Sequence, residues 1–275
     1  MDLYRVIGNP VGHSQSPWIH TRFAALTGQA LQYDKQLVPL DGFASAVQQF
    51  FTEGGRGCNV TVPFKFEAAA LATQVSDRAQ LAQAANTLTL RDDTVLADNT
   101  DGAGLVNDIQ RNAGFDLTGR RILLIGAGGA SAGVLAPLIQ TQPASITLAN
   151  RTVDKAHALV HRHAPLATLQ KTELLAQTLQ GLEGDFDVII NATASSLSGD
   201  AVPVAASTLK PGALAYDMMY GPAAQGFMTW AREHGAQPRD GLGMLVEQAA
   251  EAFVIWRGVL PPSQQVLAEL RATLA

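Results

Sequence analysis

Three short segments in the N-terminal part of the chain, 8–17, 59–65 and 98–102, contain more polar residues than a turn or a strand end needs for folding. Ser14 and Ser16 carry two hydroxyl groups two positions apart, Lys65 follows an apolar run, and Asp101 lies in a run of polar residues. An amine and a carboxylate can transfer or position a proton, and hydroxyl groups can bind a small polar molecule. We therefore expect proton transfer on a small molecule in this part of the chain.

A glycine-rich turn indicates a second kind of chemistry. It follows the apolar run 122–125 and consists of Gly126, Ala127, Gly128, Gly129, Ala130 and Ser131. Gly126 permits the tight turn, Gly128 lets the backbone approach a pyrophosphate, and Ser131 is small enough to replace the usual third glycine. The helix that follows directs its unpaired N–H groups at the phosphates. A tight turn without a ligand is the alternative, but the position between a buried strand and a helix favours dinucleotide binding.

The end of the next expected strand distinguishes the two nicotinamide cofactors. An NAD site has an acidic residue there for the ribose 2′-hydroxyl, whereas this chain has Asn150, Arg151 and Thr152, with Lys155 one helical turn further. A guanidinium and neutral donors suit a 2′-phosphate. Arg151 as a solvated surface charge is the alternative. Because cations are disfavoured at helix N-termini, the sequence favours NADP.

Hydrophobic periodicity predicts how these segments are positioned. In the first hundred residues we expect strands and a hairpin at Leu3–Ile7, Gln32–Val38, Gly57–Val62, Thr87–Leu90 and Val95–Ala97, with helices at Pro17–Leu26, Phe43–Phe51 and Phe64–Ala72. Later we expect strands at Ile122–Ile125, Ser145–Ala149, Val188–Asn191 and Ala213–Asp217, with helices at Ala130–Leu138, Val153–Arg162, Phe227–Glu233, Leu242–Trp256 and Pro261–Leu274.

This pattern predicts an α/β protein with two domains. Residues 1–101 form an N-terminal α/β substrate domain, and residues 102–240 form a Rossmann-like, doubly wound NADP-binding domain. The helices of 241–275 pack back on the first domain, which leaves a cleft between the two. Monomer and homodimer are both left open.

Composition excludes several classes of protein. The net charge of −5 argues against a nucleic-acid partner. Residues 122–150 carry no charge, but their glycines, prolines and glutamines favour a buried strand–helix–strand over a membrane span. The single Cys58 excludes an internal disulfide and is expected in the core.

No secretory signal is evident, so we expect a cytoplasmic protein with no membrane partner. His161 and His163 have no further clustered ligand; a solvated helix end is expected and no metal.

The polar segments together resemble the shikimate dehydrogenase family, which includes shikimate/quinate dehydrogenases. The resemblance runs in order along the whole chain, through Gly-Asn-Pro and His-Ser-Gln-Ser-Pro in 8–17, Asn-Val-Thr-Val-Pro-Phe-Lys in 59–65, Ala-Asn-Thr in 85–87, Asp-Asn-Thr-Asp-Gly in 98–102, Gly-Ala-Gly-Gly-Ala in 126–130, Asn-Arg-Thr in 150–152, Asn-Ala-Thr in 191–193, Tyr-Asp-Met-Met-Tyr in 216–220 and Asp-Gly-Leu-Gly-Met-Leu in 240–245. It implies NADPH-dependent reduction of 3-dehydroshikimate to shikimate, in chorismate and aromatic amino-acid biosynthesis.

The resemblance also implies roles for single residues. Lys65 is expected to transfer the proton and Asp101 to orient the substrate, although the residues themselves leave open which of the two holds the proton at each step. Ser14 and Ser16 are expected at the substrate carboxylate. The other expected substrate ligands are Thr61, Asn86, Tyr220 and Gln248. Met218 and Gly241 are expected near the nicotinamide, and Asp77 near the cofactor, where its alternative role is a helix cap.

Three departures from the family pattern concern affinity. Gln15 stands where many members have lysine, Ala132 stands where an arginine often follows the glycine turn, and 221–226 lacks the usual lysine and Thr-Pro pair. Two alternatives stay open: a quinate/shikimate dehydrogenase with relaxed cofactor and substrate choice, and a non-catalytic NADP-binding sensor.

Overall fold

The computed structural model describes residues 1–193 and 202–274. The chain divides into two compact units, each with its own six-stranded sheet. Unit 1 comprises Met1–Gly104 and Leu245–Ala275, and unit 2 comprises Leu105–Met244. These divisions fall inside two helices, α5 (Asp101–Asn107) and α10 (Leu242–Arg257), through which the chain passes between the units.

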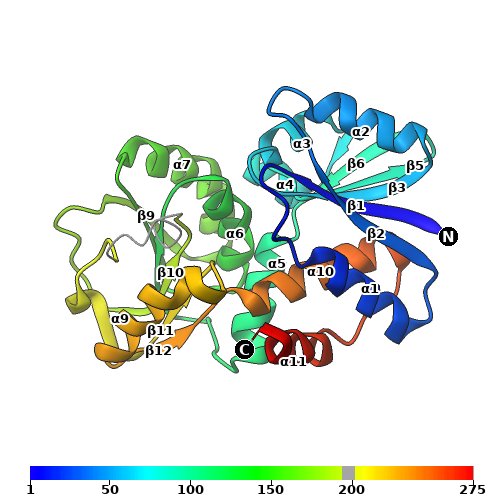
Figure 1. The fold of residues 1–275 in the computed structure, drawn as a ribbon. Coiled ribbons are helices and arrows are strands. Elements are labelled where there is room, and N and C mark those ends of the chain that lie inside the picture. Colours follow the sequence, from blue (N-terminus) through cyan, green and yellow to red (C-terminus); the bar gives the residue numbers. More distant parts are fainter. Residues whose placement is uncertain (194–201, 275) are drawn as a thin grey trace. The chain divides into compact units, whose positions relative to one another are not determined.

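The sheet of unit 1 has the strand order β2-β1-β3-β5-β6-β4. Its strands are β1 (Asp2–Gly8), β2 (Leu31–Leu37), β3 (Gly55–Val60), β4 (Gln74–Val75), β5 (Thr87–Arg91) and β6 (Thr94–Asp98). Its other helices are α1 (Ser16–Thr27), α2 (Phe43–Thr52), α3 (Lys65–Leu71), α4 (Asp77–Ala82) and α11 (Ser263–Leu274). Figure 1 shows α2 and α3 on one face of this sheet and α1 and α10 on the other.

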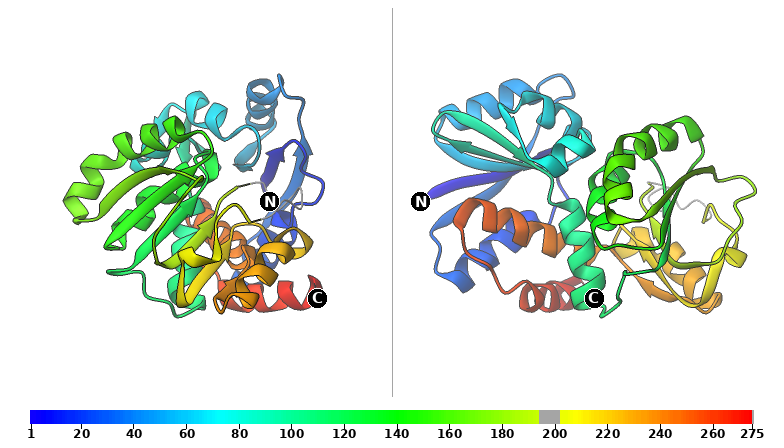
Figure 2. Two further views of the ribbon diagram at one scale, coloured as in Figure 1. Left: turned by 90° about the vertical axis from the view of Figure 1, so that its left-hand side faces the viewer. Right: turned by 180° about the vertical axis from the view of Figure 1, so that it is seen from behind.

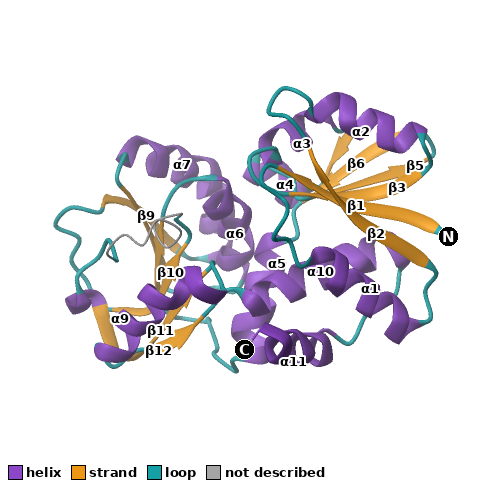
Figure 3. Ribbon diagram, in the orientation of Figure 1, coloured by secondary structure: helices purple, strands orange, loops and turns teal. Residues whose placement is uncertain are grey.

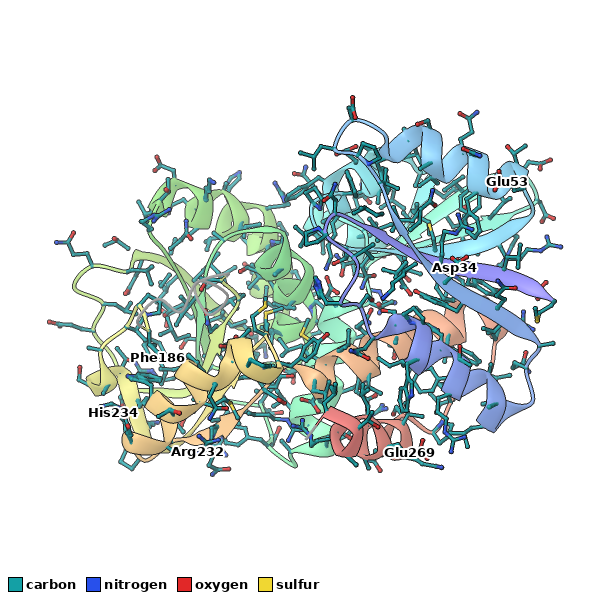
Figure 4. All side chains as sticks on the ribbon, viewed as in Figure 1. Asp34, Glu53, Phe186, Arg232, His234 and Glu269 are labelled. Carbon is teal, nitrogen blue, oxygen red and sulfur yellow. The ribbon has the colours of Figure 1, made fainter. Side chains whose placement is uncertain are left out.

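Alternating side chains on β1 fill both faces of this sheet, as the two-residue period of a strand requires. Ile7 packs with α2 in one buried cluster, which also contains Cys58. Tyr4 faces the other side, where it stacks on Trp256 of α10 with ring centroids 4.6 Å apart. An ion pair between Arg22 of α1 and Glu269 of α11 (2.6 Å) joins two helices of this side; Glu269 is labelled in Figure 4.

The sheet of unit 2 is parallel throughout. Its strands are β7 (Arg121–Ile125), β8 (Ser145–Asn150), β9 (Glu173–Thr178), β10 (Phe186–Asn191), β11 (Leu209–Asp217) and β12 (Gln237–Arg239). The spatial order β9-β8-β7-β10-β11-β12 is the 3-2-1-4-5-6 order of dinucleotide-binding folds. The Rossmann-like fold expected from the sequence is confirmed.

Helices cover both faces of this second sheet. They are α6 (Gly129–Gln140), α7 (Val153–Gln170) and α9 (Gln225–Glu233). Figure 1 shows α6 and α7 on one face and α9 on the other, and the alternation of strands and helices is visible in Figure 3. α5 continues into a π-helical turn, Asp108–Asn112, and two 3₁₀ turns lie at Ala206–Thr208 and Gly221–Ala224.

The uncharged stretch 122–150 forms β7, α6 and β8, as expected for a buried strand–helix–strand. None of the helices in 1–193 and 202–274 is long and apolar enough to cross a membrane. Three short strands were not expected: β4, β9 and β12. The β5–β6 hairpin was expected and pairs antiparallel; it is best seen from behind in Figure 2.

One expectation about histidine is wrong. His163 was expected at a solvated helix end, but α7 continues through Pro165 to Gln170, and His163 is fully buried within it. Its Nδ1 lies 2.9 Å from the backbone oxygen of Leu159, and burial lowers the pKa of this imidazole. Among the described residues no three potential metal ligands cluster.

Candidate active site

Strand direction gathers the polar segments of unit 1 at one edge of its sheet. β1, β2 and β3 run parallel, so the segments that follow them leave at the same edge. β5 is antiparallel to β3, and β6 is antiparallel to β5, so the start of β5 and the end of β6 reach that edge too. Segments 9–16, 61–65, 84–86 and 99–101 therefore share one edge, although they are far apart in sequence.

Lys65 and Asp101 form an ion pair at this edge, with 2.5 Å between Nζ and Oδ2. The lysine side chain is 20% exposed and the aspartate side chain 8%. Asp101 begins α5, where the positive end of the helix dipole favours a carboxylate. Lys65 begins α3, where the dipole disfavours an ammonium group. The buried Asp101 carboxylate offsets this unfavourable position of the ammonium group.

Asn86 holds the second oxygen of this carboxylate. Its Nδ2 donates to Asp101 Oδ1 (2.8 Å) and to Gln248 Oε1 (3.2 Å). The Gln248 amide in turn donates to the backbone oxygen of Leu245 (2.8 Å). Both amides are buried. Three of the expected site residues thus lie in one hydrogen-bonded group with Lys65.

Ser14 lies on the loop after β1 and Ser16 begins α1, with 3.2 Å between their hydroxyl oxygens. Thr61 follows β3 and packs directly on Gly8, where an added Cβ would lie 2.3 Å from the threonine methyl carbon. Glycine at position 8 therefore permits the loop to approach the Thr61 segment. These three hydroxyl groups share the edge that carries Lys65.

Asp77 also lies at this edge, because β4 runs parallel to β6 and ends just before it. It is exposed and is the first residue of α4. The capping alternative for Asp77 is wrong, because the Ser76 hydroxyl accepts the hydrogen bond from the Ala79 N–H (3.3 Å). The Asp77 carboxylate thus has no capping role.

The glycine turn of unit 2 has the geometry expected for binding phosphate. Gly126 has a φ of +106° and lies against Ala192 and Thr193, so a side chain there would be strained and crowded. Gly128 caps α6 and has open space where a Cβ would lie. The Ser131 hydroxyl donates to the Gly126 oxygen at 2.8 Å and is fully buried. The serine side chain therefore stabilises the turn through this hydrogen bond.

The expected 2′-phosphate residues follow β8, the neighbour of β7. The Asn150 amide donates to the Thr152 oxygen at 2.8 Å, which fixes the bend that presents Arg151. Arg151, Thr152 and Lys155 are exposed, and Arg151 forms no ion pair with another described residue. An unneutralised guanidinium beside a helix N-terminus is suited to an anion.

Met218, Tyr220 and Gly241 follow β11 and β12 at the same edge of the second sheet. The Gly241 N–H donates to the Met219 oxygen (2.8 Å), and a Cβ on Gly241 would lie 2.2 Å from the Met218 oxygen. Only glycine fits there. Burial raises the pKa of the half-buried Tyr220, so its hydroxyl keeps its proton at neutral pH.

Residues that sequence reasoning did not assign to the site also support it. Thr100 donates its backbone N–H to Asn86 Oδ1 (2.9 Å), and Asn59 donates to the Asn86 backbone oxygen (3.2 Å). Asp98, just before this segment, accepts from Arg78 (2.6 and 2.9 Å). Polar residues at the ends of otherwise apolar strands were the signal available for Asn59 and Asp98.

These features define a class of protein: an α/β unit with a lysine–carboxylate pair, joined to a Rossmann-like dinucleotide-binding unit. Three family models match the chain: "Shikimate dehydrogenase substrate binding domain" over residues 6–88, "Shikimate / quinate 5-dehydrogenase" over 108–199 and "Shikimate 5'-dehydrogenase C-terminal domain" over 241–271. The shikimate dehydrogenase (NADP(+)) of Acidovorax sp. strain JS42 is 66% identical over 274 residues, which cover 100% of this chain and 97% of that protein. The chain belongs to the NADP(+)-dependent shikimate dehydrogenase family, whose members are oxidoreductases.

Solved structures agree with this assignment. An Ael1 enzyme from Pseudomonas putida superposes with a TM-score of 0.89 at 45% identity, over 98% of each chain. Shikimate 5-dehydrogenase from Thermus thermophilus, in complex with NADP(H) and shikimate, superposes with a TM-score of 0.84 at 28% identity, over 100% of each chain.

Proposed function

We propose that this protein catalyses the reversible, NADPH-dependent reduction of 3-dehydroshikimate to shikimate, with Lys65 and Asp101 as its catalytic pair. The observation that carries the proposal is the 2.5 Å contact between these two side chains at a polar sheet edge. NADPH supplies the hydride that reduces the ketone carbon. The Lys65 ammonium supplies the proton for the ketone oxygen, and in the reverse direction Lys65 accepts it.

Asp101 keeps Lys65 in place and accepts a hydrogen bond from a substrate hydroxyl. Asn86 supports this role because it donates to the same carboxylate and limits its rotation. Ser14 and Ser16 would donate to the substrate carboxylate, and Thr61, Gln248 and Tyr220 would complete the hydrogen bonds to the ring. The loop carries Gln15 where many family members have lysine, so neutral donors replace a cation there.

The cofactor is proposed to bind across the C-terminal ends of β7 and β8. Backbone N–H groups from Ala127 to Ala130 would hold the pyrophosphate, and Arg151 with Thr152 and Lys155 would hold the 2′-phosphate. Met218 and Gly241 would lie beside the nicotinamide, and Asp77 would approach the cofactor from the first domain. The functional division into residues 1–101 with 241–275, and 102–240, belongs to this proposal.

The cellular setting is part of the same proposal. A free, buried Cys58 suits a reducing compartment. We propose a cytoplasmic enzyme with no nucleic-acid or membrane partner; monomer and homodimer are distinguished by sedimentation. Cell fractionation with a membrane marker tests the location.

Spectrophotometry at 340 nm tests the activity. The purified protein is assayed with shikimate and with quinate, each with NADP⁺ and with NAD⁺. We expect turnover with shikimate and NADP⁺, and little with quinate or NAD⁺. Comparable rates with quinate and NAD⁺ would favour the relaxed shikimate/quinate dehydrogenase, an activity that one matching family model includes in its description. Binding of NADPH without any turnover would favour the non-catalytic sensor.

A further inference from the structure

A chain of buried side-chain hydrogen bonds leads from Tyr33 on β2 to the carboxylate of Asp101. The Tyr33 hydroxyl donates to Asn59 Oδ1 at 2.7 Å. Asn59 Nδ2 then donates to the Thr87 hydroxyl oxygen at 3.2 Å, and that hydroxyl donates to Asn86 Oδ1 at 2.9 Å. Finally, Asn86 Nδ2 donates to Asp101 Oδ1 at 2.8 Å.

Every donor in this chain points in the same direction, from Tyr33 toward Asp101. An amide side chain has one accepting and one donating end. Because Tyr33 donates to the oxygen of Asn59, the nitrogen of Asn59 must face Thr87. The Thr87 hydroxyl then has to donate onward, which turns the Asn86 oxygen toward it and the Asn86 nitrogen toward Asp101. Two backbone contacts support the same orientation: Asn59 Nδ2 also donates to the Asn86 backbone oxygen (3.2 Å), and the Thr100 N–H also donates to Asn86 Oδ1 (2.9 Å). The Tyr33 hydroxyl adds the donor that satisfies the Asn59 oxygen at the start of the chain.

Tyr33 is suited to begin this chain because its own hydroxyl has a fixed role. The residue is 7% exposed, and its ring stacks on His20 with centroids 4.4 Å apart and an interplanar angle of 3°. Burial raises the pKa of Tyr33 well above its usual value. The hydroxyl therefore keeps its proton and remains a donor across the working pH range.

The chain lies next to the reacting groups without being part of them. Asn59, Asn86 and Thr87 are each buried to 5% exposure or less, and the chain ends on the oxygen of Asp101 that does not contact Lys65. Loss of a donor in such a low-dielectric network leaves an unsatisfied buried acceptor and loosens the groups beyond it.

We propose that Tyr33 is a positioning residue for the reaction, acting through Asn59, Thr87 and Asn86 to fix the carboxylate of Asp101 and hence the ammonium of Lys65. This role rests on the function proposed above. Tyr33 is not among the residues expected to bind substrate or cofactor, but its hydroxyl also interacts with Ser16. Measuring kcat and KM separately therefore distinguishes an effect through Asp101 from an effect through Ser16, and we expect the effect on kcat to be the larger.

The test compares Tyr33→Phe with Tyr4→Phe. Tyr4 is the register partner of Tyr33 on the adjacent strand and is buried to 4% exposure, but its hydroxyl contacts Arg257 (3.4 Å) instead of the chain. Both variants lose one buried hydroxyl group from the same part of the sheet. We expect Tyr33→Phe to lower kcat about tenfold, with less than about a threefold change in the KM for shikimate. Tyr4→Phe is expected to keep the wild-type kcat.

Thr87 provides a second test within the same chain. Thr87→Ser keeps the hydroxyl group and is expected to keep most of kcat, whereas Thr87→Val removes it and is expected to lower kcat about as much as Tyr33→Phe. Because both losses interrupt the same series of hydrogen bonds toward Asp101, the double variant Tyr33→Phe/Thr87→Val should lose less than the product of the two single effects.

The possible outcomes separate this role from the function on which it rests. An active wild-type enzyme with equal kcat in Tyr33→Phe and Tyr4→Phe overturns the role of Tyr33 and leaves the function intact. Fully multiplicative losses in the double variant also overturn it. No turnover of shikimate by the wild-type protein overturns the proposed function and the positioning role together.

Discussion

His20 makes the stability of this protein depend on pH in a predictable way. It lies in α1, fully buried among the rings of Phe23, Tyr33, Phe253 and Trp256. Neither ring nitrogen has a hydrogen bond of normal geometry. Burial lowers the pKa of His20 to about 3, and the nearby Asn59 amide opposes this only in part.

The size of the effect follows from this pKa. Below pH 6.5 the histidine of the unfolded chain takes up a proton, whereas in the folded protein it stays neutral until about pH 3. The unfolded state therefore binds one more proton, and the free energy of unfolding falls as pH falls through this window. One full proton corresponds to about 1.4 kcal/mol per pH unit, and the unfolded histidine is half protonated at pH 6.5, so the loss between pH 6.5 and 4.5 is about 2 kcal/mol. Above pH 6.5 this contribution is fully present.

Urea unfolding of the wild type and His20→Leu between pH 7.5 and 4.5 measures the effect. Leucine fills a similar volume without a titratable group, so the free energy of unfolding of the variant should fall less steeply, by about 1.4 kcal/mol per pH unit below 6.5. Phe23→Leu, in the same cluster, should lower stability equally at every pH. Parallel curves for the wild type and His20→Leu would refute the reasoning.

Three further predictions concern other parts of the chain. Burial raises the pKa of Cys58 to about 12, so a thiol-specific reagent should label native protein at least about a hundredfold more slowly than unfolded protein; equal labelling rates would show that the thiol is exposed. Asp108 is fully buried and accepts two hydrogen bonds from Arg239 (2.8 and 2.5 Å). Arg239→Met should therefore cost about 3 kcal/mol in urea unfolding, whereas the exposed Arg232→Met (labelled in Figure 4) should cost under about 0.5 kcal/mol. Arg151→Ala should raise the KM for NADPH about tenfold and leave the KM for NADH nearly unchanged; equal changes for both cofactors would contradict a 2′-phosphate contact.

The fold could be predicted well where hydrophobic periodicity is strong. β7 contains the continuous apolar run 122–125 and β8 carries no charged residue, as expected for buried parallel strands. The glycine turn between β7 and α6 indicates the order of the elements around it. β9 and β12 were missed because both are edge strands with polar side chains, and β12 has only three residues. The burial of His163 was missed because the helix was expected to end at Arg162, whereas α7 continues through Pro165 to Gln170.

The site could be predicted in its parts but not in its connections. Lys65, Asp101 and Asn86 could be predicted as site residues because they lie in polar segments next to strands, where the fold itself does not require polar side chains. The hairpin expected from the sequence brings the segments of Asn86 and Asp101 to the same edge. The sequence does not show that Asn86 Nδ2 donates to Asp101 Oδ1, because this contact depends on side-chain geometry. The contribution of Tyr33 could not be predicted from the sequence either, because a tyrosine on a strand with alternating polar and apolar residues is common in any half-buried sheet.

The most direct test of the account is the turnover of Lys65→Ala with saturating shikimate and NADP⁺, followed at 340 nm. Removal of a general acid–base group typically costs between about 10² and 10⁴ in rate, so we expect kcat to fall about a thousandfold while NADPH binding, measured by fluorescence, stays unchanged. Lys171→Ala, an exposed lysine at the end of α7, is the matched control and should turn over like the wild type. Turnover of Lys65→Ala within about threefold of that control would contradict the assignment of Lys65 as the proton-transfer group.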